Sequence, residues 1–77
     1  MTAPRELDCR GLRCPQPVIE LARRVGDVAV GGLLAVVATD PAAGSDIRAW
    51  CRMKGQEFVG EEVTGDGTPR YIVRRLT

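Results

Sequence analysis

The sequence predicts an α/β fold of the α+β kind: a two-layer sandwich in which two helices cover one face of a four-stranded mixed sheet. Six patterned segments follow one another in the order β-α-β-α-β-β along 77 residues. A Gly-rich turn near the carboxyl end joins the last two strands into a hairpin. Two helices with one apolar stripe each can bury those stripes on a shared sheet. We expect a single domain over residues 1–77, with a loose lead-in over residues 1–5.

The first strand and the first helix lie on either side of Gly11. Residues 6–9 alternate, so that Leu7 and Cys9 share one face, as in a half-buried strand. The helix starts directly after Cys14, with Pro15 and Pro17 in its first turn, and Gly26 is a natural stop for it. Because a residue before proline avoids the α region, the alternative is that Gln16 is the cap and the helix starts at Pro17. The predicted apolar stripe consists of Val18, Leu21, Ala22 and Val25.

The second half of the chain predicts a central strand, a helix and a hairpin. Residues 33–38 form an apolar run that is too short for a confident helix and fits a buried strand. The second helix starts at Asp40 as N-cap, or later at Ser45, and ends at Gly55. Residues 64–69 form the turn of the hairpin. The buried face of the second helix comprises Ile47, Trp50 and Cys51.

Composition removes several classes of function. Eleven basic and ten acidic residues leave a net charge of +1, and the chain has three aromatic residues, so nucleic-acid binding is not expected. No apolar run is long enough to span a bilayer, and the amino end lacks an apolar leader, so we expect a cytoplasmic protein without a membrane partner. Histidine is absent, which excludes histidine-based catalysis and argues against a zinc site. We expect neither cofactor nor metal.

Cys14 is the candidate reactive residue among three cysteines, an odd number that favours free thiols in a reducing compartment. It lies just before a predicted helix, whose amino end favours negative charge, and Arg10 and Arg13 are close in sequence. These features predict a stabilised thiolate. The residues alone leave a second interpretation open, in which Cys14 is a small residue at a strand-to-helix turn.

One longer pattern resembles a known family. It consists of Leu7-Asp8-x-x-Gly11-Leu12-x-Cys14-Pro15-x-Pro17, then Thr39-Asp40-Pro41, then Asp46-Ile47 and Cys51, and it covers nearly the whole chain. This pattern resembles the TusA/SirA-like sulfur carrier proteins. The resemblance implies the same β-α-β-α-β-β sandwich. It also implies that Cys14 accepts sulfur as a persulfide, that Pro15 and Pro17 shape its turn, and that Asp8 and Gly11 hold the loop, with Arg13 inside the motif.

The resemblance further implies a relay of sulfur from a donor, such as a cysteine desulfurase or a rhodanese, to an acceptor protein in a pathway such as tRNA thiolation. The chain would be a monomeric, sulfurtransferase-type carrier without independent turnover, and Arg10, Asp40 and Asp46 are candidates for a partner-binding rim. The alternative is a small binding or redox-regulatory module whose Cys14 is structural or a redox sensor. Cys9 is expected in the core, with a resolving thiol as the other reading, and Cys51 is expected in the core.

Overall fold

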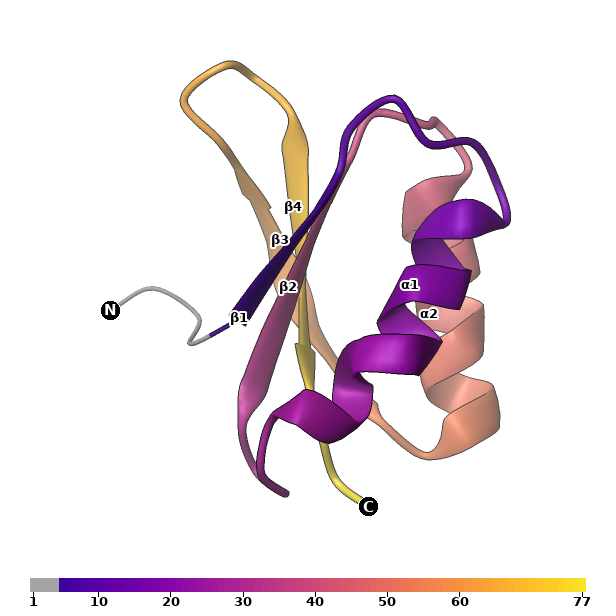
Figure 1. Cartoon of the computed structure of the whole chain (residues 1–77), viewed down its shortest axis with the longest axis vertical. Helices are drawn as coiled ribbons and strands as arrows, with labels where there is room; N and C mark the ends of the chain where they lie inside the picture. Colours follow the sequence, from indigo (N-terminus) through magenta and orange to yellow (C-terminus); the bar gives the residue numbers. More distant parts are fainter. Residues whose placement is uncertain (1–4) are drawn as a thin grey trace.

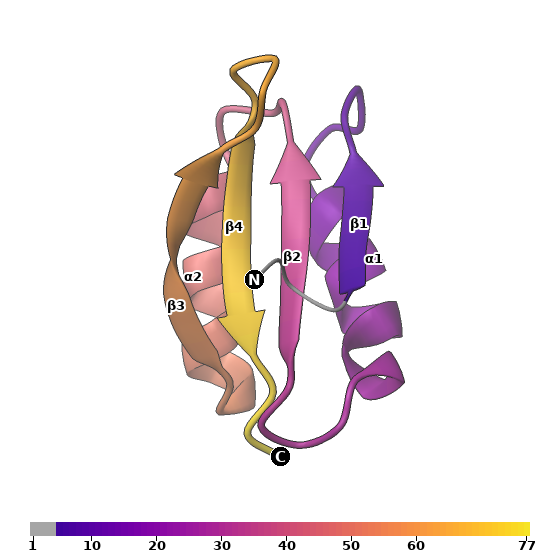
Figure 2. The ribbon, with the colours of Figure 1, turned by 90° about the vertical axis from the view of Figure 1, so that its left-hand side faces the viewer.

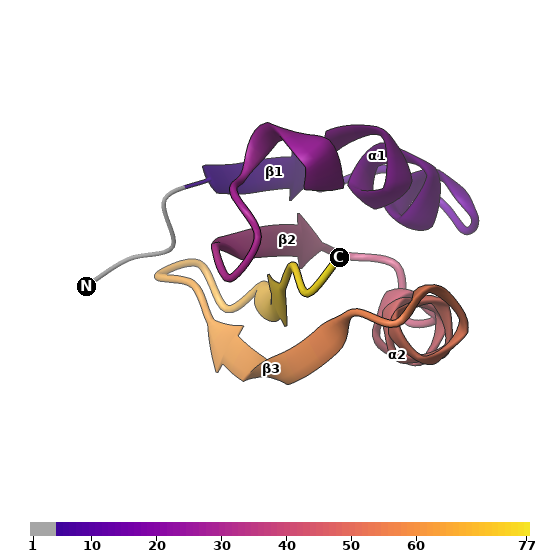
Figure 3. The same ribbon diagram turned by 90° about the horizontal axis from the view of Figure 1, so that it is seen from below.

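The structure, a computed structural model, describes residues 5–77 and confirms the predicted α+β sandwich. The sheet order is β1-β2-β4-β3; β1 and β2 are parallel, and the other neighbours are antiparallel. Both helices cover one face of this sheet (Figure 1), which leaves the strands in view from the opposite face (Figure 2). Seen from below, helices and strands form two layers (Figure 3). The elements are β1 (Arg5–Cys9), α1 (Gln16–Arg24), the short 3-10 helix η1 (Val25–Asp27), β2 (Leu33–Ala38), α2 (Ala43–Lys54), β3 (Glu57–Val63) and β4 (Pro69–Arg74).

The predicted lead-in over residues 1–5 is wrong at its last residue. Arg5 is the first residue of β1, because it pairs with Leu34 in the parallel ladder between β1 and β2. Residues 1–4 lie outside the described part of the chain.

β2 is the centre of the sheet, with β1 on one side and β4 on the other. Residues 34–38 are all buried, as the uninterrupted apolar run predicts. Leu34 and Val36 pack into the core beneath the helices. On the opposite face, Arg70 of β4 forms an ion pair with Glu6 of β1 at 2.8 Å and therefore reaches across β2. The core thus lies between β2 and the helices, and ion pairs span the open face.

The core side of α2 agrees with the sequence pattern, whereas that of α1 is shifted. Ile47, Trp50 and Cys51 are all buried, as predicted. In α1, Leu21 is buried, but Ala22 of the predicted stripe is exposed and Pro17 is buried instead. Pro17 and Leu21 are four residues apart and therefore lie on the same face of α1, which is the face that packs against the sheet. Ala22 lies outside this face.

The helix ends differ from the predictions in three places. α1 begins at Gln16, with Pro15 at the N-cap position, one residue before the alternative start at Pro17. It ends at Arg24, and Gly26 lies in η1 rather than in a left-handed cap. α2 begins at Ala43, after a turn, and at neither predicted start.

The turn before α2 exists because the carboxylate and carbonyl of Asp40 organise it. The carboxylate accepts a hydrogen bond from the Ala42 backbone N–H at 3.4 Å, and the Asp40 carbonyl accepts one from the Ala43 N–H at 3.0 Å. The stop at Gly55 is confirmed, with φ at 70°. Within residues 5–77, no helix is both long enough and apolar enough to cross a membrane.

Candidate functional site

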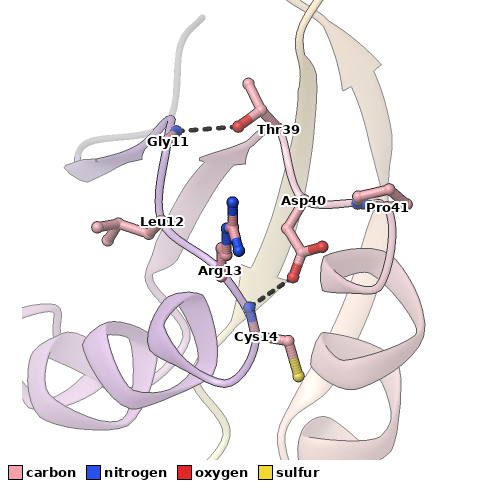
Figure 4. Close-up of a pocket in the computed structure, with 7 residues that line it drawn as sticks. All are labelled: Gly11, Leu12, Arg13, Cys14, Thr39, Asp40 and Pro41. Atoms are coloured by element: carbon pink, nitrogen blue, oxygen red, sulfur yellow. Dashed lines mark hydrogen bonds between the residues drawn. The ribbon is translucent and has the colours of Figure 1, made fainter.

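Cys14 lies at the edge of the sheet where the two parallel strands end. The loop after β1, residues 10–15, meets the loop after β2, residues 39–42, because neighbouring parallel strands point their carboxyl ends to the same edge. Figure 4 shows the two loops side by side, with Cys14 between them and the helices. The Cys14 residue is exposed to solvent. The topology therefore displays this thiol at a surface.

Two hydrogen bonds fasten the loops to each other. The Gly11 backbone N–H donates to Oγ1 of Thr39 at 2.9 Å, and the Cys14 backbone N–H donates to Oδ2 of Asp40 at 2.5 Å (Figure 4). Gly11 has a φ of 80°, which a side chain would strain. Asp8 supports the start of the loop by accepting the Arg10 backbone N–H at 3.2 Å. Asp8, Gly11 and Asp40 thus fix the backbone that carries the thiol.

Arg10 does not serve the thiol, contrary to the electrostatic expectation from the sequence. Its guanidinium forms ion pairs with Asp8 at 3.0 Å and with Asp66, in the turn between β3 and β4, at 3.1 Å. This pairing ties the site loop to the distant hairpin turn. Arg13 lines the cavity beside Cys14 and is the cation at the site itself.

The sulfur of Cys14 faces a carboxylate. Its thiol donates a hydrogen bond from Sγ to Oδ2 of Asp46, in the first turn of α2, at 2.7 Å. This hydrogen bond raises the pKa of Cys14, and partial desolvation and the negative charges of Asp46 and Asp40 act in the same direction. The predicted stabilised thiolate is therefore wrong. Arg10 and Arg13 are close to Cys14 in sequence, whereas Asp46, which contacts the sulfur, follows 32 residues later and is brought there by the fold.

Two hollows meet at Cys14. One, of about 360 Å³, lies between the loops and has a mixed lining, whose polar members include Arg13, Thr39 and Asp40. The other, of about 260 Å³, is mainly apolar and lies toward the helices, beneath the exposed Met53. It is lined by Cys14, Pro15, Val18, Asp46, Ala49, Trp50 and Met53. A group that approaches the sulfur therefore meets a mixed polar and apolar lining on one side and a mainly apolar lining, which includes Asp46, on the other.

The other two cysteines belong to the core. Cys9 and Cys51 are 1% and 2% exposed and lie in one cluster with Leu21 and Ile47. Burial raises the pKa of both thiols. The core positions predicted for Cys9 and Cys51 are confirmed, and burial of Cys9 disfavours the resolving-thiol reading.

Some of the site residues predicted from the sequence lie next to Cys14, and others do not. Asp40, Asp46 and Arg13 gather around Cys14, and Gly11 and Pro15 shape the same loop. Pro17 is a buried residue of α1. Asp8 and Arg10 pair with each other at the start of the loop and support the site without lining it. Thr39, which the sequence places only within the family pattern, and Trp50, which it predicts on the buried face of the second helix, also line the two hollows.

Fold and site together define a small α+β domain that displays one thiol at the edge of a parallel strand pair and keeps its other thiols inside. The family model described as Sulfurtransferase TusA matches residues 5–75. The chain belongs to this family.

Similar proteins agree with that assignment. A protein of Pseudomonas syringae named sulfur carrier protein TusA is 44% identical over 75 residues, which cover 97% of this chain and 88% of the relative. A protein of the same name from Pseudomonas paraeruginosa is 46% identical over 77 residues, covering 97% and 96%. The solved structure of a SirA-like protein from Desulfitobacterium hafniense has the same fold, with a TM-score of 0.79 at 16% identity, over 95% of this chain and 99% of that one.

Proposed function

We propose that this chain is a sulfur carrier that holds sulfur as a persulfide on Cys14. It receives the sulfur from a donor protein, such as a cysteine desulfurase or a rhodanese, and passes it to an acceptor protein in a cytoplasmic pathway such as tRNA thiolation. The observation that carries the proposal is the exposure of Cys14, within the family motif, while Cys9 and Cys51 are buried. A protein partner can reach one thiol of three.

The transfer is an exchange at sulfur. The Cys14 thiolate attacks the outer sulfur of a donor persulfide, R-S-SH; the new bond joins Sγ to that sulfur, the donor S–S bond breaks, and the donor leaves as a thiolate. The proton lost from Cys14 goes to that donor thiolate through solvent, so the products are Cys14-S-SH and R-SH. Delivery repeats this exchange with an acceptor thiol. No net oxidation occurs.

The surroundings of Cys14 suit a carrier that depends on its partners. The groups that line the two hollows around it are acids, an arginine, a threonine and apolar side chains, and the chain has no histidine to act as a neutral-pH base. A partner must therefore help to generate the thiolate. Of the expected rim residues Arg10, Asp40 and Asp46, we keep Asp40 and Asp46, which line the hollows beside the sulfur, and leave out Arg10, which pairs with Asp8 and Asp66. We add Arg13, which lines the same hollow as Asp40, and we propose that the carrier acts as a monomer.

A loading experiment tests the proposal. The protein is incubated with a cysteine desulfurase and cysteine that carries radiolabelled sulfur, and the label that remains on the chain is counted before and after reduction. We expect reducible label on the wild type and on the matched variants Cys9→Ala and Cys51→Ala, and none on Cys14→Ser. Equal labelling of Cys14→Ser would overturn the proposal. So would a failure of the wild type to load both with the desulfurase and, in a parallel reaction, with a rhodanese. A Cys9–Cys14 disulfide would then favour the redox module.

A further inference from the structure

The carboxylates near Cys14 differ from all other acidic groups of the chain in what they contact. Eight of the ten acidic residues form ion pairs, and all ten lie within the described residues 5–77. Asp40 and Asp46 form none within that range; they accept hydrogen bonds from the backbone N–H and from the thiol of Cys14. The paired acids are Glu6, Asp8, Glu20, Asp27, Glu57, Glu61, Glu62 and Asp66.

The two carboxylates have different tasks by geometry. Asp40 contacts the backbone of Cys14 and also its own turn before α2, so it holds the loop. Asp46 contacts Sγ itself, the atom to which sulfur is attached. Its backbone is fixed by the first turn of α2, where the Asp46 N–H donates to the Ala42 carbonyl at 3.0 Å. Asp46 is thus a rigidly mounted charge beside the reacting atom.

The geometry points to Asp46 as the residue that keeps sulfur chemistry at Cys14 slow until a partner has docked. In the empty carrier, its carboxylate holds the thiol as a hydrogen-bonded S–H and so suppresses the nucleophilic thiolate. In the loaded carrier, it opposes the loss of sulfur to stray thiols. The second of these effects rests on the proposed function; the first does not.

The retention effect follows from the leaving group. When a free thiolate R-S⁻ attacks the outer sulfur of Cys14-S-SH, the bond from that sulfur to Sγ breaks and R-S-SH forms. Cys14 leaves as a thiolate beside the Asp46 carboxylate and then takes a proton from solvent to restore the S–H. Thiols with a lower pKa leave faster, so a carboxylate that disfavours the thiolate slows this loss. The same repulsion that protects the empty thiol therefore protects its cargo.

Three charged groups line the two hollows that meet at Cys14. These are Asp46 from α2, Asp40 from the loop after β2, and Arg13 from the loop of Cys14 itself. Arg10 is engaged by Asp8 and Asp66. Asp46 alone among them hydrogen-bonds to Sγ, so its replacement is the direct test.

The test compares wild type with Asp46→Asn, a change that removes the charge and keeps the shape. The first measurement is the rate of Cys14 alkylation by iodoacetamide across a pH series. The second is the rate at which chemically persulfidated protein loses its sulfur to glutathione. In Asp46→Asn we expect the alkylation profile to move to lower pH, and both rates at neutral pH to rise several-fold. The added thiolate outweighs its lower intrinsic nucleophilicity.

Two variants control for charge and for loop position. Glu57→Gln removes an acid that pairs with Arg74 where β3 begins and β4 ends. This variant should leave both rates at the wild-type value. Asp40→Asn should move the alkylation profile less than Asp46→Asn. Equal thermal unfolding midpoints of wild type and Asp46→Asn confirm that this variant is folded. If Asp46→Asn does not fold, Asp46→Glu, which keeps the carboxylate, is measured as a second variant and is expected to behave like wild type.

The outcomes separate this inference from the proposed function. Loading on Cys14 with unchanged alkylation and unchanged sulfur loss in Asp46→Asn would overturn the inference and leave the carrier proposal standing. A wild type that loads no sulfur from donor enzymes, with a shifted alkylation profile in Asp46→Asn, would overturn the carrier proposal and retain the control of the thiol by Asp46. Slower alkylation in Asp46→Asn would contradict the inference outright.

Discussion

The hydrophobic core and the surface site around Cys14 both involve α2, and each contains a cysteine in a different environment. On the inner side, Cys51 lies among Leu21, Ile47 and the sheet, 2% exposed. At the amino end of the same helix, Asp46 reaches the exposed thiol of Cys14. The pKa of both thiols is raised, by burial in the core and by a carboxylate hydrogen bond at the surface.

The accessibility and the acidity of a thiol are therefore set by different contacts in this fold. Burial makes Cys51 inert because no partner can reach it, whereas Cys14 is open to partners but held as a thiol. The core positions α2, and α2 in turn positions the carboxylate that faces the sulfur. Substitutions in the core, in the loop that carries Cys14 and in the hairpin turn that braces this loop test the two environments separately.

The largest effect is expected in the core. Ile47→Ala removes a fully buried side chain from the inner face of α2 and should lower the free energy of unfolding by about 2–5 kcal/mol. Met53→Ala on the same helix removes an exposed side chain, which is 74% accessible, and should change it by less than about 0.5 kcal/mol. Urea unfolding followed by circular dichroism measures both. Similar losses in the two variants would mean that α2 is not anchored as described.

A smaller effect is expected in the loop that carries the thiol. Gly11→Ala meets no atom within 4 Å but forces a φ of 80° on a residue with a side chain, so it should cost about 1–2 kcal/mol. Gly26→Ala also enters open space, at a φ that is not positive, and should stabilise by about 0.4–1 kcal/mol. Opposite signs in thermal or urea unfolding support the loop geometry. A stabilising Gly11→Ala would contradict it.

The smallest effect is expected in the hairpin turn that braces the site loop through Arg10. Hydrogen bonds from Thr64 and Thr68, and then the contact with Arg10, hold the pKa of Asp66 well below its usual range. A lowered carboxyl pKa stabilises the fold at pH above the ordinary value of about 3.9, and this contribution is lost as the pH falls through the lowered pKa. Stability curves of wild type and Asp66→Asn should therefore differ at neutral pH and converge in acid. A gap independent of pH would exclude this cause.

The fold could be predicted because its signals are local. The apolar run of β2, the left-handed Gly55 after α2 and the turn before β4 each follow from neighbouring residues. The errors lie where distant segments decide the outcome. The sequence predicts Asp40 as a helix cap, but Asp40 organises the turn before α2 and also accepts a hydrogen bond from the Cys14 backbone N–H, 26 residues away. Helix ends depend on such contacts, and a sequence pattern does not contain them.

In the site, too, local features could be predicted from the sequence and tertiary contacts could not. Cys14 and its prolines could be identified from the motif, because the spacing is local and the family resemblance covers it. The electrostatics could not, since nearness in sequence suggested Arg10 while the fold brought Asp46 to the sulfur. Whether a thiol is primed or restrained is decided by tertiary contacts, so the sign of the predicted pKa shift was wrong.

Peptide mapping of the loaded protein tests most directly the claim that one thiol of three carries the sulfur. After incubation with a sulfur donor under native conditions, the chain is alkylated, digested and analysed by mass spectrometry, and the added sulfur is assigned to each cysteine. The structure predicts sulfur on the peptide that contains Cys14 and none on those that contain the buried Cys9 and Cys51. Comparable sulfur on either buried cysteine, or its absence from Cys14, would contradict the account.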